Sequence, residues 1–287
     1  MRINGVLLVI LAAILWGLSG GLGGFLMDKG WSPLVIAFYR GTVGLLFILT
    51  WFFFRPSALN RPMIIWSIFA GIGVAGNLGF YNISISESSI AVAATLMYTA
   101  PVFVFLISFI FRLEEMSLSK WLAILFVMAG VVLLTEVYHV GPDSISLLGL
   151  VSGLASGISY ALFIFSFKYA DSYGQPQGIL SIAFISFSIV MLLFIDRSEA
   201  ISVLQSSDIG WMIVLGFFGA GLSFFLYITG LKRTTSTSAS IAAMVEPVTA
   251  SLFGFVVLSQ TLAMNQIAGM GIILVTVTSL STKQSEK

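Results

Sequence analysis

Residues 98–109 read YTAPVFVFLISF, and residues 244–255 read MVEPVTASLFGF. A shift of 146 positions places Pro101 on Pro247 and Val102 on Val248. The same shift also matches Leu106 with Leu252, Phe109 with Phe255, Tyr81 with Tyr227, and Ala93 with Ala239. Of the seven prolines in the chain, only Pro101 and Pro247 fall inside long apolar segments. We therefore expect one structural unit to occur twice.

The composition is that of an integral membrane protein. The chain has 287 residues, of which 58% are hydrophobic and 9% are charged, and its mean hydropathy is +1.06. A soluble domain carries about 25% charged residues, so this chain has too few to cover a water-facing surface. The net charge of +1 leaves no basic surface for nucleic acid. With no cysteine and a single histidine, His139, we expect no disulfide, metal site or redox cofactor.

Ten apolar segments are each long enough to cross the hydrocarbon core as a helix, which takes about 20 residues. The turns between them carry Pro33, Pro56, Pro62, Pro142 and Pro176. The expected fold is therefore an all-α integral membrane bundle of ten transmembrane helices. The expected spans are 4–27, 34–54, 63–83, 89–111, 120–136, 147–168, 177–195, 209–230, 237–258 and 264–281.

The basic residues in the short loops predict the orientation, because Lys and Arg are retained on the cytoplasmic side. A cytoplasmic N-terminus puts ten of them inside and only Lys29 and Arg197 outside. The inside set is Arg2, Arg55, Arg61, Arg112, Lys120, Lys168, Lys232, Arg233, Lys283 and Lys287. We expect both termini to lie in the cytoplasm, with the chain in the cytoplasmic membrane.

Five spans per unit is an odd number, so the second unit must enter the membrane from the opposite side. This predicts two inverted five-helix repeats, residues 1–137 and 147–282. Such halves can exchange inward-open and outward-open shapes around a site near the middle of the membrane. A rigid inverted-repeat channel is the competing interpretation, but the sequence has no ring of like charges and no filter-like loop.

Four stretches resemble the EamA-type branch of the drug/metabolite transporter superfamily. They are Leu15-Trp16-Gly17-Leu18-Ser19, Phe38-Tyr39-Arg40, the small-residue run into Pro101, and Ser238-Ala239-Ser240-Ile241-Ala242-Ala243-Met244-Val245-Glu246-Pro247. The resemblance extends from the first expected span to the last. It implies a ten-helix inverted-repeat carrier, commonly an exporter of amino acids, related metabolites or drugs.

The sequence departs from the family where a Gly-Glu pair usually follows the fourth and ninth helices. The first half reads Leu113-Glu114-Glu115, and the second reads Leu258-Ser259-Gln260. The second half has thus lost its carboxylate at this position.

Glu246 and Arg40 are the only ionisable residues well inside an expected span. A charge at the bilayer centre costs roughly 2.5 to 3.5 kcal/mol on insertion scales, so such residues normally face a cavity or a partner. Glu246 is expected to bind substrate or to carry a proton, with an ion pair or hydroxyl contact that only holds helices together as the alternative. Arg40 could bind a substrate carboxylate or gate the path, or could simply extend to the lipid headgroups.

The prolines next to these positions predict breaks in two spans. Pro247 should free the carbonyl of Ala243, and Pro101 should free that of Met97. We expect Pro101 and Pro247 to sit at equivalent, facing positions beside the central cavity and to act in gating.

Trp16, Tyr98 and Tyr160 fall near the middle of their spans, where an indole N–H or a phenol in lipid would lack a partner. With Glu246 they would form a pocket for an apolar or aromatic solute that carries a cationic amine. Simple core packing is the alternative for each ring. Asn77, among the glycines of the third span, could line the pore or support close helix packing.

The sequence therefore favours a secondary active exporter of amino acids or related small metabolites and drugs, driven by protons or by the substrate gradient. An uptake permease is the alternative within transport, because carriers are reversible. An intramembrane enzyme is the alternative of another class. The sequence argues against it, because it contains no catalytic dyad, no Ser/His/Asp set and no metal ligands at membrane depth. The expected partners are a small-molecule substrate and the lipid bilayer, and a homodimer is also compatible with the sequence.

Overall fold

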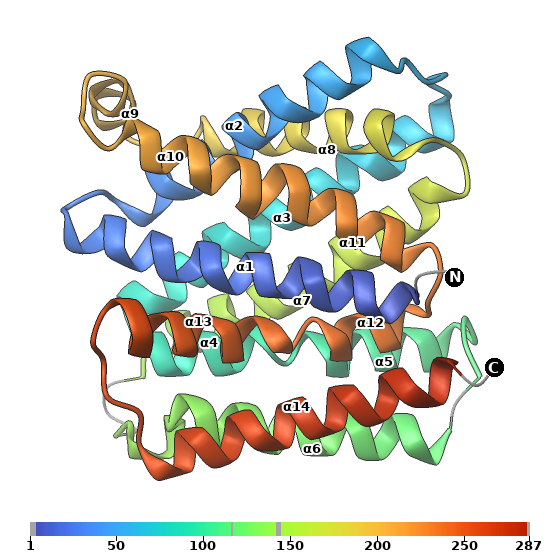
Figure 1. Ribbon diagram of the computed structural model, residues 1–287, viewed down its shortest axis with the longest axis vertical. Coiled ribbons are helices and arrows are strands. Elements are labelled where there is room, and N and C mark those ends of the chain that lie inside the picture. The colour runs from blue at the N-terminus through green and yellow to red at the C-terminus, as the bar shows by residue number, and fades with distance from the viewer. Residues whose placement is uncertain (1–3, 116, 142–144, 286–287) are drawn as a thin grey trace.

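The structure, a computed structural model, describes residues 4–115, 117–141 and 145–285. Arg2, Pro142 and Lys287 lie outside these residues. The described chain folds into one bundle whose helices run between two ends (Figure 1). We call the end where the first helix begins and the last helix finishes the terminal end, and the opposite one the distal end.

The first part of the chain, up to residue 141, forms six α-helices and one short 3-10 helix. These are α1 (Gly5–Asp28), α2 (Pro33–Phe54), α3 (Arg61–Glu87), α4 (Ile90–Met97), α5 (Ala100–Ile110), α6 (Leu118–Thr135) and η1 (Val137–His139).

The second part, from residue 145, forms eight α-helices and one π-helical segment, η3. These are α7 (Leu147–Asp171), α8 (Pro176–Met191), α9 (Arg197–Val203), α10 (Ile209–Gly216), η3 (Phe217–Leu222), α11 (Ser223–Leu231), α12 (Ser236–Ala242), α13 (Val245–Val257) and α14 (Met264–Ser285).

Short polar residues fix where many helices begin, because their side chains accept hydrogen bonds from backbone N–H groups of the first turn. The residues that cap the long helices in this way are Asn4, Ser32, Asn60, Ser117 and Ser146. Proline also stands in the first turn of α2, α3 and α8, where its missing N–H costs nothing.

Within the described residues, nine segments are long and apolar enough to cross a membrane. The expected span 177–195 is different, because α8 ends at Met191 after 16 residues. At about 1.5 Å per residue, α8 falls short of the roughly 30 Å hydrocarbon core. The all-helical membrane bundle is thus confirmed, while the count of ten crossings stays a prediction.

Two expected spans are broken at matching positions. Span 89–111 divides into α4 and α5, and span 237–258 divides into α12 and α13. Pro101 is the second residue of α5 and Pro247 the third of α13, so each proline follows a break closely. One detail of the prediction was wrong: the carbonyl of Ala243 is not free, since it accepts the N–H of Glu246 at 2.9 Å across a tight turn.

The π-helical segment η3 interrupts the expected span 209–230 between α10 and α11. Nothing in the sequence predicted this change of winding. Segments of this kind are rare and occur frequently at functional sites.

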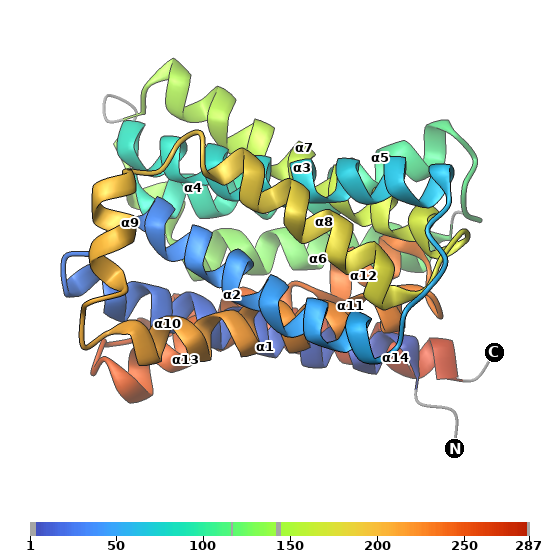
Figure 2. The same cartoon turned by 90° about the horizontal axis from the view of Figure 1, so that it is seen from above.

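The first helices of the two parts run in opposite directions (Figure 1), and the inverted repeat itself stays a prediction. Helix α1 runs from the terminal end to the distal end, whereas α7 starts at the distal end and runs back (Figure 1). The second view shows the broken span α12–α13 on the opposite side of the bundle from α4 and α5, with α12 reaching α5 at the terminal end (Figure 2).

Helix α1 packs tightly against the break between α12 and α13 because of Gly17. A Cβ atom at Gly17 would lie 2.4 Å from the carbonyl oxygen of Glu246 and 2.6 Å from the Cβ of Thr249. Only a residue without a side chain lets the two backbones approach this closely. The position of Glu246 therefore depends on Gly17.

Topology can be tested with single cysteines, because the chain contains none of its own. Ser117 lies at the terminal end and Ser198 in α9 at the distal end. We expect Ser117→Cys and Ser198→Cys to react with a membrane-impermeant maleimide from opposite sides, the former only from the cytoplasm. Reaction of both from one side would contradict the topology.

The close contact at Gly17 can be tested with Gly17→Ala, with Gly24→Ala of the same helix as its matched control. Overpacking typically costs about 1–3 kcal/mol, so Gly17→Ala should lower the melting temperature of the purified protein. A Cβ at Gly24 has no neighbour within 4 Å, so that variant should be as stable as the parent or slightly more. Equal melting temperatures for both variants would show that the contact is not tight.

Candidate functional site

A cavity of about 330 Å³ occupies the distal half of the bundle. Its walls come from both parts of the chain, and its lining reaches the exposed side chains of Met27 and Ile90 at the distal end. Its deepest lining residues are aromatic and lie near the middle of the bundle: Trp16, Tyr160, Phe163 and Phe224. The exposed part of the lining that the structure describes thus lies toward the distal end.

The structure brings the six residues predicted for substrate binding or coupling together in this one cavity. They come from α1, α2, α3, α7, α13 and the break after α4. These residues are Trp16, Arg40, Asn77, Tyr98, Tyr160 and Glu246. Their functional roles stay predictions, because shared position alone does not test them.

Glu246 stands at the second residue of α13, directly after the helix break. Its carboxylate lies close enough to Tyr160, Tyr98 and Arg40 to interact with them electrostatically. Its side chain is surrounded by protein, and its remaining accessible surface faces the cavity. Among the described residues, the ion pairs within 4.0 Å are elsewhere, so the carboxylate of Glu246 is not neutralised by a direct salt bridge.

Arg40 points into the bundle and not toward the headgroups. Its Nε donates a hydrogen bond to the carbonyl of Gly219 at 3.0 Å, within η3. A Cβ at Gly219 would approach the Oγ of Ser19 to 2.8 Å and the Nε of Arg40 to 3.0 Å, so a glycine is needed for this contact. The π-helical segment therefore gives Arg40 a fixed anchor and leaves the rest of its guanidinium for the cavity.

Trp16 is the centre of an aromatic floor beneath the cavity. Its ring centroid lies 5.0 Å from that of Phe224 and 4.9 Å from that of Tyr227, and Tyr160 meets it edge-on at 6.5 Å. Trp16 is only 3% exposed, and its Nε1–H has no hydrogen-bond partner in the described part of the chain. A buried donor without a partner costs free energy, which a solute carrying an acceptor could recover.

Asn77 has a clear packing role in addition to its place in the wall. Its Nδ2 donates to the backbone carbonyl of Ser156 at 3.2 Å and to the Oγ of Ser156 at 3.1 Å. The Oγ of Ser156 in turn donates to the backbone carbonyl of Asn77 at 2.8 Å. This reciprocal contact fixes α3 against α7.

Pro101 and Pro247 are both buried, but neither of them lines the cavity. The residues at the breaks, Tyr98 and Glu246, line it instead. We had expected the prolines themselves to lie beside the cavity. The lining residues instead precede them by one to three positions, because each proline lies within the first turn of the helix that follows the break.

Sequence reasoning did not single out Tyr81, Phe163, Phe184, Phe187 and Phe224, which also line the cavity. One signal was available, since the 146-residue shift pairs Tyr81 with Tyr227. Tyr81 lies in the wall and Tyr227 packs under Trp16. The four phenylalanines could not be distinguished by residue type from the other 21 in the chain, because Phe is common throughout.

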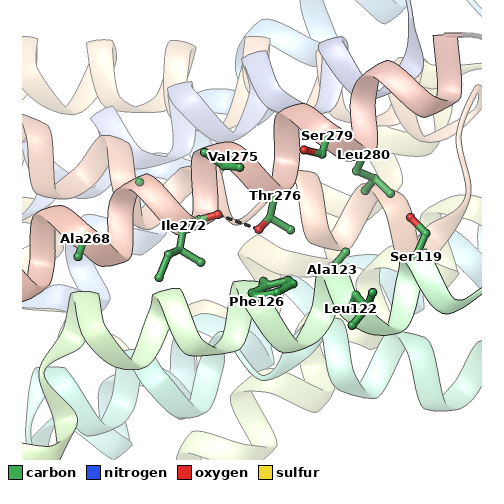
Figure 3. Close-up of a pocket in the computed structure, with 11 residues that line it drawn as sticks. Ser119, Leu122, Ala123, Phe126, Ala268, Ile272, Val275, Thr276, Ser279 and Leu280 are labelled. Atoms are coloured by element: carbon green, nitrogen blue, oxygen red, sulfur yellow. Dashed lines mark hydrogen bonds between the residues drawn. The ribbon is translucent and has the colours of Figure 1, made fainter.

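A second, larger hollow of about 590 Å³ lies between α6 and α14 (Figure 3). Apolar side chains such as Leu122, Phe126 and Val275 line it, and these are 43%, 53% and 69% exposed. The hydroxyl of Thr276 donates a hydrogen bond to the carbonyl of Ile272 at 2.7 Å. Because this hollow is apolar and lies on the outside of the bundle, we expect lipid to fill it and place the candidate site at Glu246.

Comparison with known proteins agrees with this geometry. The EamA-like transporter family matches residues 3–136 and again residues 147–282. An uncharacterized transporter of Archaeoglobus fulgidus is 26% identical over 93% of this chain and 92% of its own length. The uncharacterized transporter YwfM of Bacillus subtilis is 21% identical over 93% and 90%. The uncharacterized inner membrane transporter YicL of Salmonella typhimurium is 24% identical over 97% and 95%.

A solved crystal structure has the same fold, with a TM-score of 0.75 at 17% identity over 97% of this chain and 98% of the other. Two family matches that together cover nearly the whole chain, joined to an all-helical membrane bundle, establish the relationship. This chain belongs to the EamA-like transporter family.

Proposed function

We propose that this protein is a secondary active transporter that exports amino acids or related small metabolites and drugs across the cytoplasmic membrane by alternating access. The observation that supports this most strongly is the cavity, which is open toward the distal end and ends at Glu246 and an aromatic floor. Its volume falls within the range of about 300–1,000 Å³ that is usual for small-molecule sites.

Glu246 can act in two ways. It can bind a solute amine directly, or it can exchange a proton as the cavity changes sides. Both ways require a carboxylate that is shielded from lipid and reached by only one end at a time. The cavity supports this proposal, because Glu246 lies in its lining together with Tyr98 and Tyr160.

Arg40 and Trp16 supply groups of the opposite kind. The guanidinium of Arg40 carries a positive charge on the cavity wall, and the indole of Trp16 offers an unpartnered N–H donor. Together with Glu246 they can bind a solute that carries both an amine and an acceptor such as a carboxylate, with an apolar part against the aromatic floor. This combination favours amino acids and similar amphipathic metabolites.

The family resemblance favours export over uptake. We propose both this direction of transport and the coupling to protons. An uptake permease would use the same cavity. Proteoliposomes that are loaded with a labelled panel of amino acids and drugs distinguish the two when a pH gradient is imposed in either direction.

The role of Glu246 is tested with Glu246→Gln, which keeps the shape and removes the charge. If Glu246 exchanges protons, the variant should lose transport driven by a pH gradient, to the level of protein-free liposomes, while it keeps some solute exchange. If Glu246 binds the amine of the solute, both activities should fall. The measurement is flux of the labelled solute with and without the gradient.

Glu136→Gln serves as the matched control, because Glu136 lies in the distal loop after α6 and does not line the cavity. It should transport like the parent protein in both assays. If Glu246→Gln also transported like the parent in both, Glu246 would be a structural residue and the proposed mechanism would be wrong.

A further inference from the structure

The terminal end of the bundle is closed by a charged contact between the two halves of the chain. The carboxylate of Glu114, in the loop between α5 and α6, accepts a hydrogen bond from Nζ of Lys120 at 2.8 Å. It also accepts the backbone N–H of Thr237 at 3.0 Å. Thr237 lies in the first turn of α12, so the first half holds the start of the broken span that carries Glu246.

Additional contacts hold the same end. Nζ of Lys168, on α7, donates to the carbonyls of Leu231 and Thr234, both at 2.7 Å. Between these contacts and the cavity, the side chains of Val9, Phe167 and Tyr227 are fully buried. The terminal end is therefore packed shut, while the distal end is open.

Glu114 is ionised in this contact. Burial alone would raise its pKa, but the hydrogen bonds from Lys120 and Thr237 and the positive charge of Lys120 outweigh burial, and the pKa lies below its usual range. The side chains of Lys120 and Glu114 are only 13% and 6% exposed, so water and salt screen the pair weakly.

The second half of the chain carries neutral amides at the two positions that correspond to Glu114 and Lys120 in the repeat. The 146-residue shift takes Glu114 to Gln260 and Lys120 to Gln266. At the distal end, Gln260 is exposed, and Gln266 donates to the carbonyl of Leu134 at 3.3 Å and accepts the N–H of Ala263 at 3.0 Å. The Glu114–Lys120 ion pair thus has only neutral amides at its repeat-related positions, and the distal ion pair between Lys29 and Asp208 lies at other positions.

We propose that Glu114 and Lys120 form a latch that holds the terminal end closed, and that its replacement by Gln260 and Gln266 in the second half makes the resting carrier face the distal side. The inference rests on alternating access, since a latch has meaning only if each end opens in turn. In an inverted repeat, the closed distal end would bring Gln260 to the start of α4, as Glu114 now meets the start of α12. Two amides cannot supply the charge-assisted hydrogen bonds that the Glu114–Lys120 pair makes.

The test compares two double variants that change opposite ends of the bundle and should shift the equilibrium in the same direction. Glu114→Gln with Lys120→Gln removes the latch and leaves no single buried charge behind. Gln260→Glu with Gln266→Lys builds the equivalent pair at the distal end. Spin labels on cysteines report the two ends, at Leu118 and Tyr173 for the terminal end and at Ser86 and Ser198 for the distal end. All four positions are exposed and lie outside the latch.

Distances between the spin labels are measured by electron paramagnetic resonance in nanodiscs without solute. The parent protein should give a short terminal distance and a long distal one. Each double variant should shift the ratio of the two states by about tenfold toward the terminal-open form, with longer terminal and shorter distal distances.

Unchanged distances in the Gln260→Glu, Gln266→Lys variant would overturn the proposal, and this variant remains informative if the latch variant does not fold. Unchanged distances in a folded Glu114→Gln, Lys120→Gln variant would also overturn it. The readout needs no substrate. Shifted distances in a protein that transports none of the solute panel would therefore support the latch and contradict the proposed substrates.

Discussion

A carboxylate inside the membrane must be enclosed by protein, and the rest of this structure can be understood from that constraint. A charge at the bilayer centre costs roughly 2.5 to 3.5 kcal/mol even on the mildest scales, so Glu246 needs polar neighbours. Arg40 and the phenols of Tyr98 and Tyr160 supply them around one cavity. Gly17 brings α1 close enough to cover the backbone at Glu246.

Irregular backbone is the means by which this bundle places polar groups at membrane depth. The break between α12 and α13 puts Glu246 at a helix start, and η3 presents the carbonyl of Gly219 to Arg40. Unpaired backbone groups are tolerated in a membrane only where protein or a cavity surrounds them. The two halves therefore share a plan but contribute different chemistry, with the cation from the first and the carboxylate from the second.

Much of the fold was predictable because membrane spans are long apolar runs and because prolines inside them are rare. The matched prolines gave the positions of both breaks to within a few residues, and burial of ionisable and amphipathic residues identified six of the cavity side chains. The π-helical segment and the short α8 were missed, because neither has a distinct composition. The Glu114–Lys120 contact was also beyond sequence reasoning, since its third member is the backbone of Thr237, 123 residues away.

The central claim is that the cavity at Glu246 binds the transported solute. Ala250 lines this cavity one turn after Glu246, and the chain has no other cysteine to interfere with a reporter there. The most direct measurement is the rate at which an impermeant maleimide labels Ala250→Cys from the distal side, with and without a saturating transported solute. We predict that labelling occurs from that side and that the solute slows it strongly. Labelling at the same rate with and without the solute would contradict the claim.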